Sequence, residues 1–273
     1  MLVLGLAKKV LLADNLGAAF QSISALSSGS LSGGSAWLGA ICYSLQLYFD
    51  FSGYSDMAIG MGQMLGFHFP ENFNYPYTAA SVTEFWRRWH ISLTTWFREY
   101  LYIPLGGSRK GTWRTVRNIF LVWFCTGFWH GASWNFILWG LHFFVWLMLE
   151  KYLLRDFLQK LPSWLRHFYT LVVVFVGWGV FAMENLTVCA GYFKTCFGSG
   201  TLWSAADGYY LTAYGLTLLL LTVGSTRLPR KVWNRLPERA RDLLGPLLMA
   251  AGLVICTAYL VDGSYNPFLY FRF

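Results

Sequence analysis

The histidines are the candidate catalytic residues of this sequence, and His130 is the strongest of them. It lies in an apolar run, between Trp129 and Gly131. An ionisable group in such a run indicates a functional site, and burial favours a neutral imidazole that can accept a proton. A structural alternative stays open, in which His130 is a core histidine hydrogen-bonded to the backbone or to Asn135.

His90, in the segment RRWH, is the second candidate, with interfacial packing as its structural alternative. We interpret His68, His142 and His167 as structural or interfacial. The sequence has no GxSxG elbow and no cysteine with a basic partner nearby in the sequence, so it does not indicate covalent catalysis. A buried histidine base would instead suit deprotonation of an alcohol, which could then attack an activated acyl group.

The loop PLGGSRKGTWRTVR, residues 104–117, combines glycines with cations. Glycine lets backbone amides approach a phosphate, and the cations supply charge. Arg109, Lys110 and Arg114 are therefore candidate contacts for the phosphates of an acyl donor. An ordinary basic cytoplasmic loop is the alternative.

The composition excludes an ordinary soluble enzyme. Of 273 residues, 56% are hydrophobic, 19% aromatic and 12% charged, against roughly 25% charged in a typical soluble domain. The net charge of +8 comes from Lys and Arg that cluster between apolar runs, as the positive-inside rule expects of cytoplasmic loops. A nucleic-acid partner is therefore not expected, and membrane lipid is.

The apolar runs predict an all-α, polytopic membrane protein that forms a single domain over residues 1–273, with transmembrane and re-entrant or interfacial helices. The runs lie at 36–49 with a continuation at 57–69, and at 119–149, 168–188, 209–223 and 245–261. The run 119–149 is too long for one plain crossing of about 20 residues, so we expect two short helices or a re-entrant hairpin. The predicted orientation places the C-terminus outside.

Two polar segments interrupt this pattern. Asp50 and Asp56 either lie at a wet interface, at helix ends or in a turn, or they face a polar cavity or a partner such as an arginine. Ser81 and Glu84 have the spacing of a capping box, which predicts a helix from about 82 to 101. On that helix one face would be polar and another, including His90, largely aromatic.

The five cysteines have no CxxC pair and no zinc spacing, so no metal site is expected. Most are expected to be small apolar fillers. Cys189 and Cys196 fall in a stretch predicted to lie outside the membrane, where a disulfide between them is conceivable.

Long segments resemble the membrane-bound O-acyltransferase family, in its alginate O-acetyltransferase branch. They are DFSGYSDMAIGMGQMLGF, PENFNYPYTAASVTEFWRRWHISLTTWFREYLYIPLGG, TGFWHGASWNFILWG and the C-terminal NPFLYFRF. The resemblance implies a ring of helices around a thin centre, with His130 as the signature histidine and His90 as the second histidine of this branch. Asp50, Asp56, Arg87 and Arg88 would at most line that site.

The resemblance also implies a function: transfer of acetyl groups toward an exported, alginate-like polysaccharide. No tightly bound cofactor is expected, and acetyl-coenzyme A or another acetyl donor would be a substrate. Expected partners are an exported periplasmic acetyltransferase and the machinery of polysaccharide synthesis, at the bacterial inner membrane. Relatives in this branch usually carry further helices before the segment GLAKKVLLADNL, so the chain is expected to be a C-terminal portion of a longer enzyme.

Two other classes of function stay open. Discontinuous helices and midplane polar groups are also typical of transporters and channels, although the sequence shows no inverted repeat. A haem-binding protein could use His90 and His130 as axial ligands. Acetyl transfer without a visible absorbance band would favour the acyltransferase.

Overall fold

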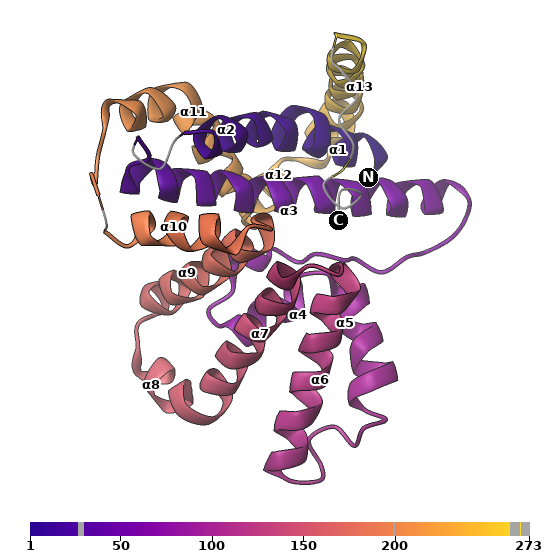
Figure 1. Ribbon diagram of the computed structural model, residues 1–273. Coiled ribbons are helices and arrows are strands. Elements are labelled where there is room, and N and C mark those ends of the chain that lie inside the picture. Colours follow the sequence, from indigo (N-terminus) through magenta and orange to yellow (C-terminus); the bar gives the residue numbers. More distant parts are fainter. Residues whose placement is uncertain (27–29, 199, 263–267, 269–273) are drawn as a thin grey trace. The chain divides into compact units, whose positions relative to one another are not determined.

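The computed structural model of the protein describes residues 1–26, 30–198, 200–262 and 268 (Figure 1). Within these ranges the regular structure is helical, without strands, and the predicted all-α membrane fold is confirmed. The chain divides into two compact units, Met1–Glu71 with Phe193–Phe273, and Asn72–Tyr192. Apart from Phe268, the C-terminal segment NPFLYFRF lies outside the described residues. The single domain over 1–273 stays a prediction.

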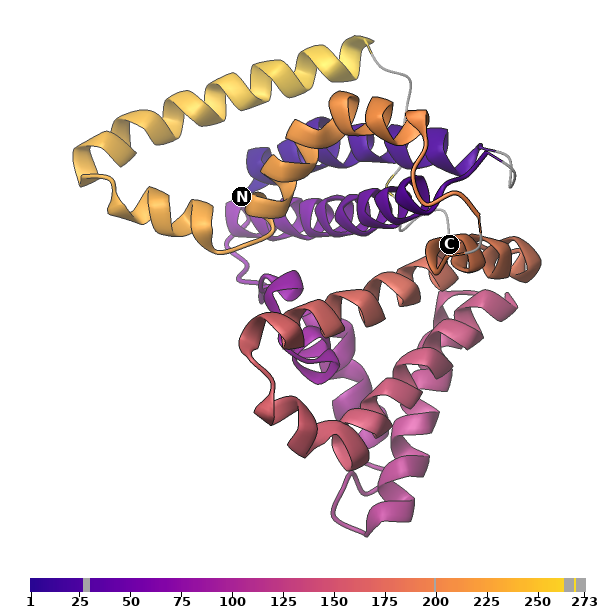
Figure 2. The ribbon, with the colours of Figure 1, turned by 90° about the vertical axis from the view of Figure 1, so that its left-hand side faces the viewer.

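The first unit is built on one long helix, α3, which contacts α1, the π-helix η1, α2 and α11. Figures 1 and 2 show α1 and α2 lying along α3. In the same unit, α13 contacts α1, and α12 contacts α11. The bounds are Leu2–Ala7 (α1), Lys8–Ala13 (η1), Asp14–Ser24 (α2), Gly33–Met64 (α3), Ala205–Gly224 (α11), Leu228–Arg235 (α12) and Glu238–Asp262 (α13).

The expected interruption of α3 at its two aspartates is wrong, because two lysines neutralise them. Lys9 Nζ lies 2.7 Å from Asp50 Oδ1 and 2.9 Å from Asp14 Oδ1, and Lys8 Nζ lies 2.6 Å from Asp56 Oδ2. Asp50 is only 1% exposed. Placement of these aspartates at helix ends or in a turn is therefore wrong. The alternative prediction, in which each aspartate faces a cationic partner, is confirmed, although the partners are lysines rather than an arginine.

The second unit contains the candidate histidines. Figure 2 shows its helices side by side, and α7 contacts both α6 and α9. The bounds are Pro76–Thr78 (η2, a 3-10 helix), Val82–Arg88 (α4), Ile91–Phe97 (α5), Arg98–Tyr102 (η3), Thr112–His130 (α6), Trp134–Leu149 (α7), Glu150–Leu154 (η4), Arg155–Lys160 (α8) and Ser163–Ala182 (α9). Helix α10, Leu186–Cys196, contains the boundary between the two units.

The run 119–149 forms two helices, as predicted, and two glycines let them pack closely. A Cβ atom on Gly127 would lie 2.5 Å from the carbonyl oxygen of Phe136, and one on Gly140 would overlap the carbonyl oxygen of Trp123. The pairs 127–136 and 123–140 run in opposite directions along the chain, so α6 and α7 are antiparallel. His130 ends α6 at the turn that joins them.

Three helical segments in the described ranges are long and apolar enough to cross a membrane. They are Trp134–Lys160, Ser163–Ala182 and Glu238–Asp262. The pair α11 and α12 meets the same criterion together and is bent by 71°. Large apolar side chains such as Leu247, Val254 and Val261 are exposed on α13, as expected where a helix faces lipid.

Candidate active site

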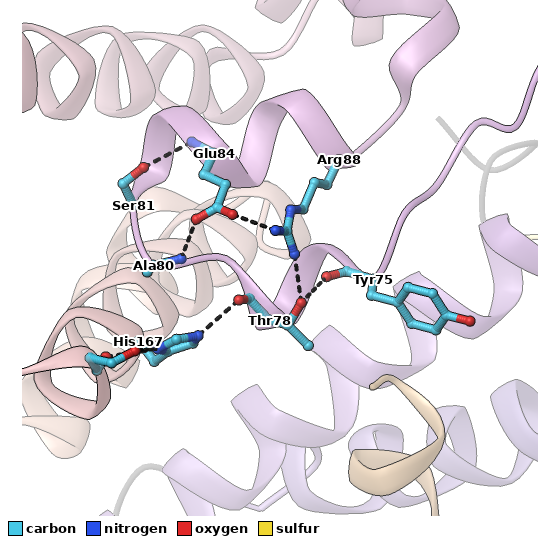
Figure 3. Close-up of polar contacts among 8 residues, drawn as sticks. Tyr75, Thr78, Ala80, Ser81, Glu84, Arg88 and His167 are labelled. Atoms are coloured by element: carbon cyan, nitrogen blue, oxygen red, sulfur yellow. Dashed lines mark hydrogen bonds and ion pairs between the residues drawn. The ribbon is translucent and has the colours of Figure 1, made fainter. Parts of the chain in front are cut away.

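Helix α4 begins at the predicted cap, and a polar network holds its first turn (Figure 3). Ser81 Oγ accepts a hydrogen bond from the Glu84 N–H at 3.0 Å. Glu84 Oε2 accepts from the N–H of Ala80 at 2.7 Å, rather than from Ser81 as a standard capping box would have it. Arg88 donates to the Glu84 carboxylate and, at 2.7 Å, to Thr78 Oγ1. The network ties both ends of α4 to the segment before it.

His167 also anchors that segment, which its sequence position did not reveal. Its Nε2 lies 2.8 Å from the carbonyl oxygen of Thr78, and its Nδ1 lies 2.7 Å from that of Ser163 (Figure 3). The ring therefore joins the start of α9 to the loop that precedes α4. This is a structural role.

A buried carboxylate from a distant part of the chain also caps α4. Glu150 Oε1 accepts from the N–H of Val82 at 2.6 Å, and its Oε2 accepts from the N–H and hydroxyl of Thr83 at 2.9 and 2.8 Å. Negative charge at a helix N-terminus is stabilising, because the first backbone N–H groups point toward it. Glu150 follows directly on α7, so it links α4 to the helix that begins just after His130.

The prediction of one helix from 82 to 101 is wrong, because the chain turns at His90. This residue has left-handed backbone angles, φ 46° and ψ 55°. Helix bonds are replaced there by bonds to the preceding loop: Ile91 N–H donates to the Asn72 carbonyl at 3.0 Å, and Asn74 N–H donates to that of Arg88 at 2.9 Å. The predicted polar and aromatic faces therefore do not continue across His90.

The side chain of His90 lies among polar and aromatic neighbours. Its Nδ1 is 3.3 Å from both Asn72 Oδ1 and Ser92 Oγ, and its ring centroid is 6.3 Å from that of Trp129. Burial lowers the pKa of His90 to about 4, because low-dielectric surroundings disfavour the charged ring. His90 is neutral at pH 7.

His130 lies among aromatic rings, just before the candidate span that begins at Trp134. Its ring centroid is 4.9 Å from that of Trp129, 5.0 Å from Trp139 and 5.1 Å from Phe181. Burial, and second the nearby charge of His90, lower its pKa to about 3. His130 is therefore a neutral imidazole packed among aromatic rings, with part of its surface still exposed.

The two candidate histidines lie close together. Each contacts the ring of Trp129, His90 from the α4–α5 turn and His130 from the end of α6. Asn135, which the structural alternative offered as a hydrogen-bond partner of His130, donates its side-chain amide to the carbonyl oxygen of Phe181 at 3.0 Å. This arrangement provides two uncharged imidazoles that can accept or pass on a proton.

The basic loop is not brought together with the histidines. Asn118 is buried and holds the loop by donating to the carbonyl oxygens of Leu105 and Gly107, at 3.2 and 2.9 Å. Arg109, Lys110 and Arg114 are exposed. They lie near the start of α6, whereas His130 ends it, about 27 Å away at 1.5 Å per residue. One donor molecule could touch both places only if it were long.

The remaining candidates have no chemistry that the structure brings to this site. His142 Nε2 lies 3.0 Å from the carbonyl oxygen of Val173, which agrees with a structural role. His68 is exposed in the irregular segment that follows α3. Cys189 and Cys196 are both free thiols. Over the described ranges, no group of three or more His, Cys, Asp or Glu could hold a metal ion.

Comparison with known proteins identifies the family. The model of the membrane-bound O-acyltransferase family matches residues 2–191. The chain belongs to the membrane-bound O-acyltransferase family. The probable alginate O-acetylase AlgI of Pseudomonas putida is 41% identical over 98% of this chain and 59% of that protein. The namesake from Azotobacter vinelandii is 49% identical over 80% of this chain and 43% of that protein.

A relative named for another acceptor also matches. The peptidoglycan O-acetyltransferase of Helicobacter pylori is 45% identical over 67% of this chain and 35% of its own length. The chain thus spans less than two thirds of the length of each of these relatives. The matched part of this O-acyltransferase family member includes His90, His130 and the residues around them.

Proposed function

We propose that the protein is a membrane O-acyltransferase that moves acetyl groups toward hydroxyls of an exported, alginate-like polysaccharide. The names of its relatives support the reaction class, because they include O-acetylases and an O-acetyltransferase. The observation that carries the proposal is the meeting of His90 and His130 at Trp129. Two neutral imidazoles brought together from separate segments suit general-base chemistry on an alcohol.

In the proposed reaction His130 is the general base. Its unprotonated nitrogen takes the proton of the acceptor hydroxyl while that oxygen attacks the carbonyl carbon of the acetyl group. The bond between this carbon and the donor then breaks, and the proton passes from the imidazolium to the departing group. Because the lowered pKa keeps His130 neutral at pH 7, no prior deprotonation is needed.

Acetyl-coenzyme A, or another acetyl donor, is the proposed co-substrate. Arg109, Lys110 and Arg114 are its proposed phosphate contacts, because they are exposed cations beside glycines. Their distance along α6 from His130 requires a donor with an extended arm. The proposed setting is the bacterial inner membrane, crossed several times, with an exported periplasmic acetyltransferase and the polysaccharide synthesis machinery as partners.

The test is transfer of radiolabelled acetyl groups to polysaccharide by membranes that contain the full-length protein. We expect His130→Ala to lower transfer by about 100-fold or more, as loss of a general base does. His90→Ala should also lower it. His68→Ala is the matched control, because this histidine is exposed and lies outside the site. Transfer that survives His130→Ala, or movement of acetyl groups across the membrane without transfer, would contradict the proposal and favour a transporter.

A further inference from the structure

Asn72 contacts the turn at His90 through both its main chain and its side chain. Its carbonyl oxygen accepts from the N–H of Ile91 at 3.0 Å. Its side-chain Oδ1 accepts from the N–H of Ser92 at 3.0 Å and from the hydroxyl of Ser92 at 2.9 Å. Three hydrogen bonds from one residue therefore hold the two residues that follow His90.

These bonds fix which way the Asn72 amide points. The oxygen and nitrogen of an amide are distinguished by their hydrogen-bond partners. A backbone N–H can only donate, so the atom that faces the Ser92 N–H must be the oxygen. The Ser92 hydroxyl has one proton, and it donates that proton to the same oxygen.

The protonation of His90 follows from this orientation. Its Nδ1 lies 3.3 Å from Asn72 Oδ1, which can only accept, and 3.3 Å from Ser92 Oγ. A lone pair on Nδ1 would face a lone pair of the Asn72 oxygen, whereas a proton on Nδ1 would make a hydrogen bond to that oxygen. A neutral imidazole carries one proton, so Nε2 then bears the lone pair.

We propose that Asn72 is a positioning residue that keeps the proton of His90 on Nδ1 and so makes Nε2 a hydrogen-bond acceptor toward the substrate. The part that concerns substrate rests on the proposed function, in which an acceptor hydroxyl enters beside the two histidines. In that setting Nε2 of His90 accepts a hydrogen bond from a second hydroxyl of the acceptor and so orients the reacting one. His130 remains the general base.

The backbone of His90 supports a functional purpose for this arrangement. A left-handed conformation at a residue other than glycine is energetically unfavourable and persists only where the surroundings impose it. Asn72 imposes it here by binding both Ile91 and Ser92. The same turn carries the ring that lies beside Trp129.

The first experiment reads the tautomer directly. The full chain, labelled with 15N-histidine in detergent micelles at pH 7.5, is studied by long-range 1H–15N correlation, and His90 is assigned from the spectrum of His90→Gln. We expect a protonated Nδ1 and an unprotonated Nε2. A protonated Nε2 with a bare Nδ1 in the unaltered protein would overturn the proposal.

The second experiment asks whether Asn72 is the cause. Asn72→Leu keeps the approximate size but removes the acceptor, so we expect a mixture of tautomers and a kcat for acetyl transfer lowered by about 10- to 100-fold, as when a supporting partner of a functional histidine is lost. Asn72→Asp keeps an oxygen at this place and should keep Nδ1 protonated. Asn74→Leu is the matched control, because only its backbone N–H contacts this turn, and it should change neither result.

The outcomes separate this proposal from the proposed function. An unchanged tautomer and unchanged transfer in Asn72→Leu would refute the role of Asn72. If the tautomer shifts as expected but the unaltered protein transfers no acetyl groups, the assignment of Asn72 stands and the proposed function fails. If transfer depends on His130 while His90 holds its proton on Nε2, the proposed function stands and the Asn72 assignment fails.

Discussion

Replacing Glu150 by Gln should loosen the start of α4 and with it the position of His90. The carboxylate accepts three hydrogen bonds, from the N–H of Val82 and from the N–H and hydroxyl of Thr83. Gln presents an amide group in place of one oxygen, so either Val82 or Thr83 faces a donor. A hydrogen bond to a charged group contributes about 1.5–3 kcal/mol, and the charge at the helix end a further 0.3–1 kcal/mol, roughly.

We therefore expect Glu150→Gln to lower the free energy of unfolding by about 2–4 kcal/mol. Glu150 is only 6% exposed, so water cannot replace the lost acceptor. Unfolding in mixed micelles, followed by circular dichroism, measures the change. At a temperature where the variant is still folded, acetyl transfer should fall by more than the folded fraction does, because His90 follows α4.

Glu99→Gln is the control for this experiment. Glu99 is exposed and pairs with the exposed Arg98, and such surface pairs contribute about 0–1 kcal/mol. The reasoning about Glu150 is refuted if Glu150→Gln unfolds like Glu99→Gln. It is also refuted if stability falls while transfer by the folded protein stays at its original level.

Three further predictions follow from the structure. Lys9→Met should lower the free energy of unfolding by about 3–5 kcal/mol, because the buried Asp50 loses a cation. Adding Asp50→Leu should recover most of that free energy. A double variant no more stable than Lys9→Met would contradict this prediction. Gly140→Ala should abolish transfer by forcing α7 away from α6, whereas Gly215→Ala, in open space, should not; equal activity would refute the close packing. The pKa of His90 is lowered from 6.5 to about 4, so between these pH values the folded state binds fewer protons than the unfolded state. The free energy of unfolding should therefore decrease as the pH is lowered from about 6.5 to 4. His90→Phe should flatten this dependence, and an unchanged slope in chemical unfolding would count against the burial of His90.

The parts of the fold that depend on neighbours in the sequence could be predicted. The apolar run 119–149 forms two helices, and Ser81 caps α4, because helix propensity and capping act over a few residues. The break at His90 could not be predicted from such patterns. Residues other than glycine are uncommon in the left-handed region, although histidine is enriched among those that adopt it. The polar and apolar spacing also continues through His90 without a sign of the break.

The partners that shape the candidate site lie too far apart in the sequence to be recognised. Asn72 acts on residues 18 to 20 positions later, and Glu150 on residues 67 and 68 positions earlier. Neither belongs to a short motif whose spacing reports a contact. The Lys9–Asp50 pair shows the same limit, because an aspartate within an apolar run indicates that a cation is needed but not which one.

Helix α4 has only seven residues, which is too few for a helix to be stable by itself in isolation. It persists because both ends are held: Glu150 binds its first N–H groups, and the loop at Asn72 and Asn74 binds the backbone where it ends. Glu150 follows directly on the C-terminal end of α7. Nearer the other end of the same helix, Trp139 packs against the ring of His130. A single helix therefore sets the position of one imidazole through side-chain packing and of the other through a capped helix. The positions of the two rings therefore depend on α7 as well as on the segments that carry them.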